Sequence, residues 1–195
     1  MRKAVLTVSF GTSHLDTMEK TIGAVEKALA EAFPDRTLYR AFTSGMILKK
    51  LKSEFQIEIC NVEEAMEQMA QDGIEDLLIQ PTHIIHGFEY DKMIEQIEPY
   101  RERFEKLCIG APLLATTGDY EEAVHLIMED ARLKEEETLV LMGHGTEHHT
   151  NAAYPALDYT FWAKGYRNVV VGTVEGFPEM EDVLKKLKEQ QAGKI

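Results

Sequence analysis

Short apolar runs alternate with longer amphipathic stretches along almost the whole chain, and this alternation restricts the fold more than any other feature. The stretches place apolar residues at helical spacing, whereas the runs have the length and composition of strands. Strands separated by helices imply βαβ crossovers and therefore a parallel sheet with helices on both faces. The expected strands are Ala4–Phe10, Thr37–Phe42, Asp76–Gln80, Leu107–Ile109, Thr138–Met142 and Asn168–Val174. The expected helices are Ser13–Phe33, a short one ending at Lys52, Val62–Asp72, Glu89–Phe104, Asp119–Ala131, Asn151–Lys164 and Pro178–Gln190.

Polar residues at the starts of several helices predict where these helices begin. Ser13 and Asp16 resemble a capping box, Thr43 or Ser44 is placed to cap the short third helix, and Asn61 to cap the fourth. In a parallel sheet the ligand sits beyond the carboxyl ends of the strands. The search for a site therefore concentrates on residues that directly follow each expected strand.

An internal repeat suggests two related halves. Val5–His14 and Leu139–His148 each read as an apolar strand followed by Gly-Thr-x-His and a helix, with an offset of 134 residues. A ten-residue match is weak alone, but the charged stretch Lys134–Glu137 is a linker candidate at the matching place. We expect an N-terminal half over residues 1–132 and a C-terminal half over residues 138–195, with the second copy only partly present.

Composition excludes several classes of protein. The chain has 195 residues, with 34 Asp+Glu against 21 Lys+Arg and a formal charge of −13, so it lacks the basic balance of a general nucleic-acid binder. No apolar run is long enough to span a membrane, and no secretory signal is expected. Cys60 and Cys108 stand in apolar surroundings and read as reduced core residues of a cytoplasmic protein.

Five of the seven histidines fall in two stretches that follow expected strands. One stretch holds His83 and His86, the other holds His144, His148 and His149. Imidazole with a carboxylate suits divalent cobalt, nickel, iron or zinc, and Glu175 follows the last strand at the same edge as His144. For most of these histidines a helix-capping or backbone-bonding role is favoured. For His144 the flanking glycines favour a functional role.

Other motifs leave alternatives open. Gly11-Thr12-Ser13 and Gly143-x-Gly145 are each placed to cradle an anion at a helix N-terminus. However, the second motif lacks the third glycine of a dinucleotide fingerprint, and no Walker sequence occurs, so nucleotide binding has little support. Glu89 reads equally well as a catalytic base or as a first-turn residue that interacts favourably with the helix dipole.

Several sequence blocks, in order along the chain, resemble the anaerobic-type sirohydrochlorin cobaltochelatases of the class II chelatase superfamily. They are VSFGTSHLDT at Val8–Thr17, RAFTSGMI at Arg40–Ile47, HIIHGFEY at His83–Tyr90, APLL at Ala111–Leu114, MGHG at Met142–Gly145 and GTVEGFPE at Gly172–Glu179. The resemblance implies two flavodoxin-like, Rossmann-like parallel-sheet halves that hold a tetrapyrrole in the cleft between them, the second half being incomplete here. It implies insertion of Co²⁺ into sirohydrochlorin during oxygen-independent cobalamin synthesis.

The resemblance also assigns residues. It implies that His144 and Glu175 hold the metal, and that His144 and Glu89 are catalytic. Substrate contacts are expected from Phe10, Gly11, Thr12, Ser13 and His83. No cofactor is expected, Co²⁺ being a substrate, and the expected partners are sirohydrochlorin and cobalt, with no nucleic acid or membrane, in a cytoplasmic homo-oligomer. Helix N-termini and Arg40 are candidates for attracting the anionic macrocycle.

The sequence departs from the family pattern at one place. A further histidine of the family, on a later strand, has no counterpart before Ile195, and nothing is assigned to His86 or Phe88. Three alternatives therefore stay open: a tetrapyrrole or metal-binding protein without turnover, a related chelatase that inserts iron or nickel, and, more remotely, a flavodoxin-like nucleotide-binding protein.

Overall fold

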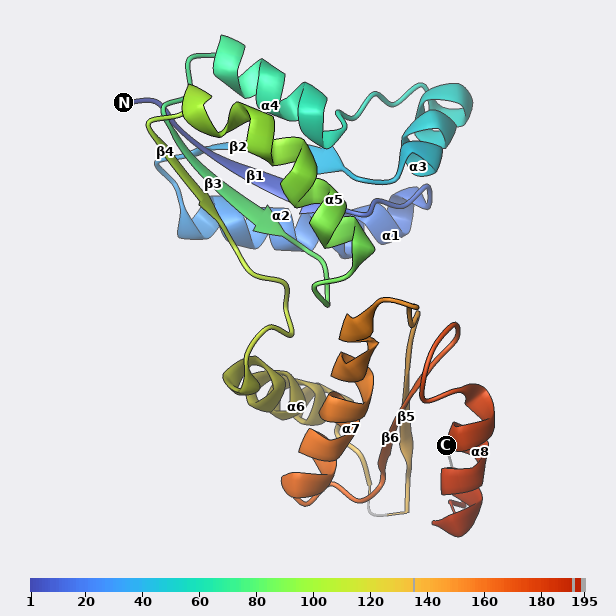
Figure 1. Cartoon of the computed structure of the whole chain (residues 1–195). Coiled ribbons are helices and arrows are strands. Elements are labelled where there is room, and N and C mark those ends of the chain that lie inside the picture. The colour runs from blue at the N-terminus through green and yellow to red at the C-terminus, as the bar shows by residue number, and fades with distance from the viewer. Residues whose placement is uncertain (135, 191, 194–195) are drawn as a thin grey trace. The chain divides into compact units, whose positions relative to one another are not determined.

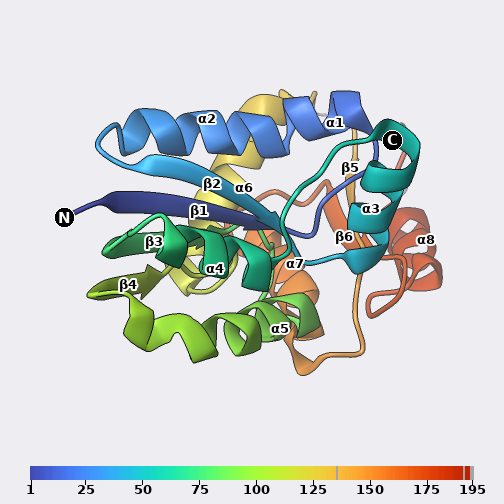
Figure 2. The same ribbon diagram turned by 90° about the horizontal axis from the view of Figure 1, so that it is seen from above.

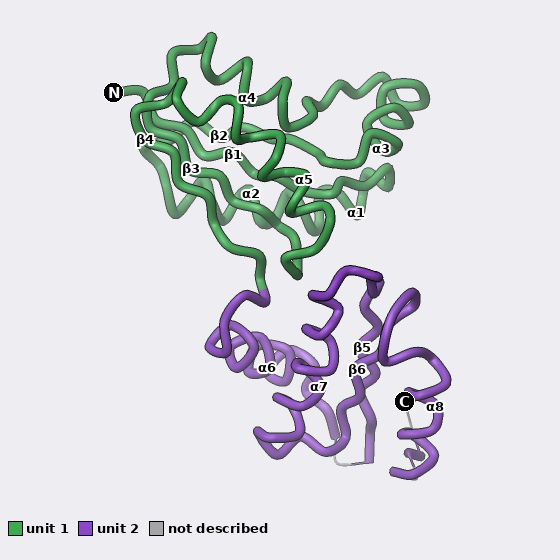
Figure 3. Tube along the Cα trace, in the orientation of Figure 1, with its two compact units in different colours: residues 1–113 green, residues 114–195 purple. Residues whose placement is uncertain are grey.

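Parallel strands covered by helices form both parts of the chain. A computed structural model describes residues 1–134, 136–190 and 192–193. It divides into two units, Met1–Leu113 and Leu114–Ile195 (Figure 3). The expected α/β class with two parallel-sheet parts is confirmed, and the two sheets have four strands and two strands.

The first unit has a four-stranded parallel sheet in the order β2-β1-β3-β4. The strands are β1 (Lys3–Ser9), β2 (Thr37–Phe42), β3 (Asp76–Pro81) and β4 (Lys106–Ile109). Helices α1 (Leu15–Lys20) and α2 (Ile22–Ala32) cover one face, whereas α4 (Val62–Gln71) and α5 (Phe88–Ile97) cover the other (Figures 1 and 2). The main hydrophobic core lies between the sheet and α4 and α5.

Three shorter segments complete this unit. Helix α3 (Gly45–Lys50) follows β2 and passes into a π-helical turn, η1 (Leu51–Phe55), and a 3₁₀ segment, η2 (Glu98–Arg103), follows α5. Pro99 lies at the start of η2, which explains why the helix expected over 89–104 changes its winding there. Likewise the helix expected over 13–33 is two helices, with the break at Thr21.

Two of the three predicted helix caps are present in the structure. Ser44 accepts a hydrogen bond from the Ile47 amide, and Asn61 forms a capping box with Glu64, as expected. The capping box predicted for Ser13 and Asp16 is wrong: His14 is the N-cap and makes no side-chain cap. Ser13 instead is buried.

The second unit contains α6 (Thr117–Ala131), β5 (Leu139–Gly143), the 3₁₀ turn η3 (His149–Ala152), α7 (Ala153–Ala163), β6 (Val169–Thr173) and α8 (Met180–Glu189). Strands β5 and β6 pair in parallel, with Leu139 opposite Val169. Helices α7 and α8 pack against β6, which is buried along its whole length. Helix α6 packs on α7 and belongs to this unit, whereas the expected first half over residues 1–132 included it. Glu135, in the expected linker 134–137, falls outside the described residues.

The cysteines do not both lie in a core. Cys60 is half-buried beside the main core, but Cys108 is exposed, so the prediction of two core cysteines is wrong for Cys108. Strand β4 is the edge strand of its sheet, and alternate residues on it face solvent. None of the helices formed by the described residues has the length and apolar character that a membrane crossing requires.

Candidate metal and tetrapyrrole site

His144 and Glu175 lie side by side at the carboxyl edge of the second sheet. His144 directly follows β5, and Glu175 stands two residues beyond β6, whose last pair with β5 is Gly143–Thr173. The two strand ends stay hydrogen-bonded past this pair, because the Glu175 amide donates to the His144 carbonyl oxygen over 2.7 Å. The imidazole Nε2 and the carboxylate Oε2 are 3.5 Å apart. Both side chains are mostly exposed, at 78% and 69%, so an incoming ion reaches them freely.

Two glycines make this close approach possible. Gly145 has φ +82°, and a Cβ there would lie 2.7 Å from the Glu175 carbonyl carbon. A Cβ on Gly143 would lie 2.2 Å from the Tyr154 ring. The two glycines of the Gly143-x-Gly145 motif therefore allow the two strand ends to pack closely. The sequence did not predict this packing role.

Asn151 and Tyr154 hold the two loops in place. The Asn151 side chain accepts a hydrogen bond from the Thr146 amide at 3.1 Å and donates to the Phe177 carbonyl oxygen at 2.7 Å. The Tyr154 hydroxyl accepts from the Gly145 amide at 3.4 Å. Asn151 thus joins the loop after β5 to the loop after β6. Its sequence position suggested only the start of a helix.

The neighbouring histidines His148 and His149 have local structural contacts, in line with the capping or backbone-bonding role expected for most histidines. His148 caps η3: its Nδ1 is 2.8 Å from the Thr150 hydroxyl, and its ring contacts that of His149 at 4.1 Å. Among the residues that the structure describes, no group of three or more histidine, cysteine or acidic side chains is arranged to hold a metal. The His144–Glu175 pair therefore offers two donors and leaves the remaining coordination positions of a divalent ion for water or substrate.

His83 and Glu89 lie at the carboxyl edge of the first sheet, after β3 and in the first turn of α5. Among the described residues, none forms a hydrogen bond with either ring nitrogen of His83 or with the buried Oε2 of Glu89. Burial lowers the pKa of His83, and the nearby charge of Glu89 partly opposes this shift. His83 is therefore a neutral imidazole at pH 7. Unsatisfied buried polar atoms of this kind are costly, which favours a partner supplied by a ligand.

The loop after β1 supplies the other expected contacts of the first unit. Phe10 exposes 47% of its surface, and Gly11 has φ +97° with the Phe42 ring packed against its Cα. The Thr12 hydroxyl accepts a hydrogen bond from the His14 amide at 3.2 Å. Ser13 is buried. Of the four predicted residues, Phe10 is thus the one that presents a large side chain outward.

Arg40 and His86 have local partners. Arg40 forms a two-pronged ion pair with the buried Glu26, so its charge is already matched, contrary to the expectation that it attracts an anionic macrocycle. His86 lies 3.0 Å from the Asp91 carboxylate and packs on the Tyr90 ring. Glu89 has a partner that the sequence reasoning missed, Lys92, whose ammonium lies 3.8 Å from Oε2. A glutamate and a lysine three residues apart on a helix were the available signal.

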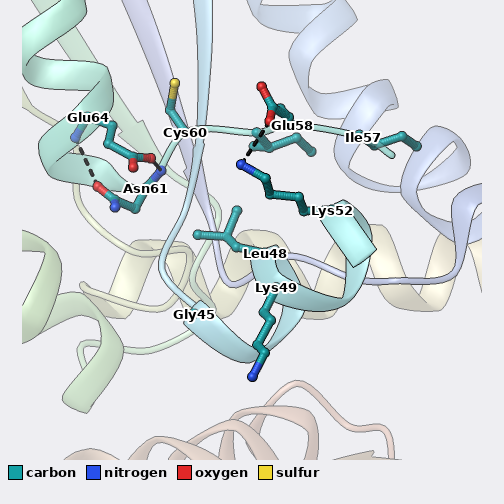
Figure 4. A pocket seen from close by; sticks show the side chains of 10 residues that line it. Gly45, Leu48, Lys49, Lys52, Ile57, Glu58, Cys60, Asn61 and Glu64 are labelled. Carbon is teal, nitrogen blue, oxygen red and sulfur yellow. Dashed lines mark hydrogen bonds and ion pairs between the residues drawn. The ribbon is translucent and has the colours of Figure 1, made fainter. Parts of the chain in front are cut away.

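A cavity of about 610 Å³ lies elsewhere in the first unit, beside α3 and η1 (Figure 4). Lys52 and Glu58 form an ion pair of 2.9 Å on its wall, and the Asn61–Glu64 capping box forms another part. None of the predicted site residues lines it. Its charged groups are matched locally, so we assign it no role in the chemistry.

Known proteins resemble this chain along nearly its whole length. A family model described as cobalt chelatase (CbiK) matches residues 3–195. A sirohydrochlorin cobaltochelatase of Salmonella typhimurium is 41% identical over 191 residues, which are 97% of this chain and 72% of that protein. Sirohydrochlorin cobaltochelatase CbiKC of Nitratidesulfovibrio vulgaris is 30% identical over 196 residues, covering 98% and 68%.

One solved structure shows the same fold. SirB from Bacillus subtilis with Fe³⁺ has a TM-score of 0.68 at 16% identity, over 96% of this chain and 72% of that one. At this identity the likeness concerns the fold alone. The family model, by contrast, matches residues 3–195, a range that includes every residue of the site described above. This chain therefore belongs to the CbiK family of cobalt chelatases.

Proposed function

We propose that this chain is a sirohydrochlorin cobaltochelatase that inserts Co²⁺ into sirohydrochlorin in cobalamin synthesis. Membership of the cobalt chelatase family and the names of two relatives support this function. The observation that carries the assignment to residues is the His144–Glu175 pair, an exposed imidazole and carboxylate 3.5 Å apart on adjacent parallel strands.

His144 and Glu175 are proposed to hold the ion before transfer. A neutral imidazole and a carboxylate are suitable ligands for Co²⁺, and the carboxylate neutralises part of its charge. Two protein donors bind the ion less tightly than four do, which suits an ion that must leave for the pyrrole nitrogens. His144 is also proposed to be catalytic, because an imidazole at the site is able to hold the ion or to accept a pyrrole proton.

Glu89 is proposed to assist loss of the two pyrrole protons. Its Oε2 is buried and has no hydrogen-bond partner in the described part of the chain, so it is available to accept a proton from the substrate. We propose that Phe10, Gly11, Thr12, Ser13 and His83 contact the macrocycle. Phe10 offers an exposed ring for stacking, and neutral His83 offers unpaired nitrogens for the polar substituents.

The proposal also covers the cofactor requirement, the oligomeric state and the cellular compartment. No cofactor or nucleotide is required, since metal insertion exchanges ligands and protons without redox change. A homo-oligomer in the cytoplasm is proposed as the working state. The unpaired thiols of Cys60 and Cys108 agree with a reducing compartment.

The test is an anaerobic insertion assay with the purified chain, sirohydrochlorin and Co²⁺, followed by the absorption change of the metallated ring. His144→Ala is expected to reduce the rate by about 100-fold or more, and Glu175→Gln and Glu89→Gln by about 10-fold or more. His125→Ala, which removes an exposed imidazole on α6, is the matched control and is expected to keep the rate.

Three results would contradict the proposal. Binding of sirohydrochlorin without any spectral sign of metal entry would indicate a binding protein without turnover. A higher rate with Fe²⁺ or Ni²⁺ than with Co²⁺ would overturn cobalt as the substrate. A wild-type rate in His144→Ala would remove the metal assignment.

A further inference from the structure

Lys92 connects Glu89 to the backbone of the neighbouring strand ends. Its ammonium donates a hydrogen bond of 2.8 Å to the Thr43 carbonyl oxygen and lies 3.8 Å from the Glu89 carboxylate. Lys92 and Glu89 stand on α5, whereas Thr43 directly follows β2. A single side chain thus bridges a helix on one face of the sheet and the turn at its carboxyl edge.

Thr43 belongs to the same hydrogen-bonded layer as the loop after β1. The Thr43 amide donates to the Ser9 carbonyl oxygen at 2.9 Å, and the Ser44 amide donates to the Phe10 carbonyl oxygen at 3.2 Å. Thr43 and Ser44 are both buried. The end of β1, the turn after β2 and the start of α5 are therefore joined, with Lys92 as the link to the helix.

This arrangement differs from an ordinary surface ion pair. An exposed pair of long side chains contributes little, because ordering both chains offsets the attraction. Lys92 and Glu89 expose 45% and 37% of their side chains, but the lysine is already held by a backbone carbonyl, and the Glu89 Oε2 that faces it is buried with no hydrogen bond to a described residue. Lys92 thus provides a fixed positive charge beside a carboxylate whose inward oxygen has no other fixed partner among the described contacts.

We propose that Lys92 is a positioning residue, which holds the Glu89 carboxylate in its working orientation and ties it to the loops that contact the substrate. The inference rests on the proposed role of Glu89 and deepens it. Lys92 itself is not assigned a contact with the metal or the macrocycle. Its loss is therefore expected to reduce kcat for cobalt insertion and leave KM for sirohydrochlorin nearly unchanged.

The test compares Lys92→Met, Lys92→Arg, Glu89→Gln and the double variant Lys92→Met/Glu89→Gln. Lys92→Met is expected to lower kcat by about 10-fold with KM within about twofold, and Lys92→Arg to restore most of the rate. In the Glu89→Gln background the same Lys92→Met change is expected to alter kcat by less than about twofold, since coupled residues are not additive. Lys27→Met, which removes an exposed lysine from a surface pair with Glu31, is the matched control.

A second measurement does not depend on activity. Amide hydrogen exchange at Thr43 and Ser44 is expected to accelerate about 10-fold in Lys92→Met, and to stay unchanged in Lys92→Arg and Lys27→Met. Additive losses of kcat in the double variant, or a wild-type kcat in Lys92→Met, would overturn the proposal. If the wild-type chain itself inserts no metal, the proposed function fails, and unchanged exchange in Lys92→Met would then reject the link as well.

Discussion

Strands β1 and β5 carry the same sequence motif but have different surroundings. β1 is an inner strand of its sheet, paired with β2 and β3, and its residues from Ala4 to Ser9 are all buried. Among the described residues β5 pairs with β6 alone, and none of its residues is fully buried. The comparison teaches that an apolar run followed by Gly-Thr-x-His specifies a strand and a turn. The strands and helices packed around that strand decide how much of it is buried.

The two motifs also end differently. Phe10 precedes the glycine after β1 and presents an aromatic ring, whereas His144 stands at the matching place after β5 and presents a metal ligand. We interpret the first edge as a surface for the macrocycle and the second as a holder for the ion. Variants at matching positions of the two motifs test this interpretation.

The largest expected difference is in catalysis at the matched positions Phe10 and His144. His144→Ala is expected to lower kcat by about 100-fold or more, because a metal ligand is lost. Phe10→Ala is expected to raise KM for sirohydrochlorin by up to about 10-fold and to leave kcat nearly unchanged, since stacking contributes to binding. Steady-state kinetics with varied sirohydrochlorin measures both, and a large fall in kcat for Phe10→Ala would erase the distinction.

Stability should differ at the matched core positions of the two strands. Leu6 of β1 is completely buried, so Leu6→Ala is expected to lower the free energy of unfolding of the first unit by about 2–5 kcal/mol. Val140 of β5, the residue that matches Leu6, is only half-buried, and Val140→Ala is expected to cost about 1 kcal/mol. Urea unfolding followed by hydrogen exchange separates the units, and Trp162 fluorescence reports the second. Equal losses would contradict the difference in burial.

The two glycines of the motifs offer a smaller contrast. Gly11→Ala places a Cβ 2.5 Å from the Phe42 ring, whereas Gly145→Ala places one 2.7 Å from the backbone of Glu175. Both have positive φ, so each variant is expected to be destabilised by about 1–2 kcal/mol. A ring can turn aside more easily than a strand end, so only Gly145→Ala is expected to weaken Co²⁺ binding, measured by calorimetry. Unchanged Co²⁺ affinity would show that the strand ends tolerate separation.

The smallest expected effect is a pH dependence confined to the first unit. Because burial lowers the pKa of His83, the unfolded chain binds a proton at this residue more readily than the folded chain. Stability from this group is thus complete above the unfolded pKa of about 6.5 and falls as the pH drops below it. His83→Gln is expected to flatten the slope of the unfolding free energy between pH 7 and 5. An unchanged slope in that variant would indicate that His83 titrates normally.

Much of the fold was predictable because its signals are local. Alternating apolar runs indicated the parallel sheets, and Ser44 and Asn61 cap the helices that they were expected to cap. The break at Thr21 and the uncapped start of α1 were missed, since Ser13 is drawn into the interior instead of capping the helix. A capping pattern specifies which bonds a residue is able to make, and burial of the side chain decides whether it makes them.

The site was predictable to the extent that it follows from strand order. Parallel strands end at one edge, so His144 and Glu175 were expected to meet, and they lie 3.5 Å apart. The packing role of Gly143 and Gly145, the tie through Asn151 and the contact of Lys92 with Thr43 had no pattern that predicts them. Each joins residues that are distant in the sequence or depends on how close two backbones approach.

The sequence by itself determined the class of fold, the chelatase family and the residue types available for holding cobalt. The class of fold follows from the periodicity of apolar side chains within short segments, and the family and the residue types follow from short sequence blocks; both kinds of signal are local. Only the tertiary structure decided that β1 is enclosed while β5 is half-exposed, that the ring nitrogens of His83 are buried, and that Lys92 faces Glu89. Burial and long-range contacts depend on all the elements packed around a residue, and no local pattern contains that information.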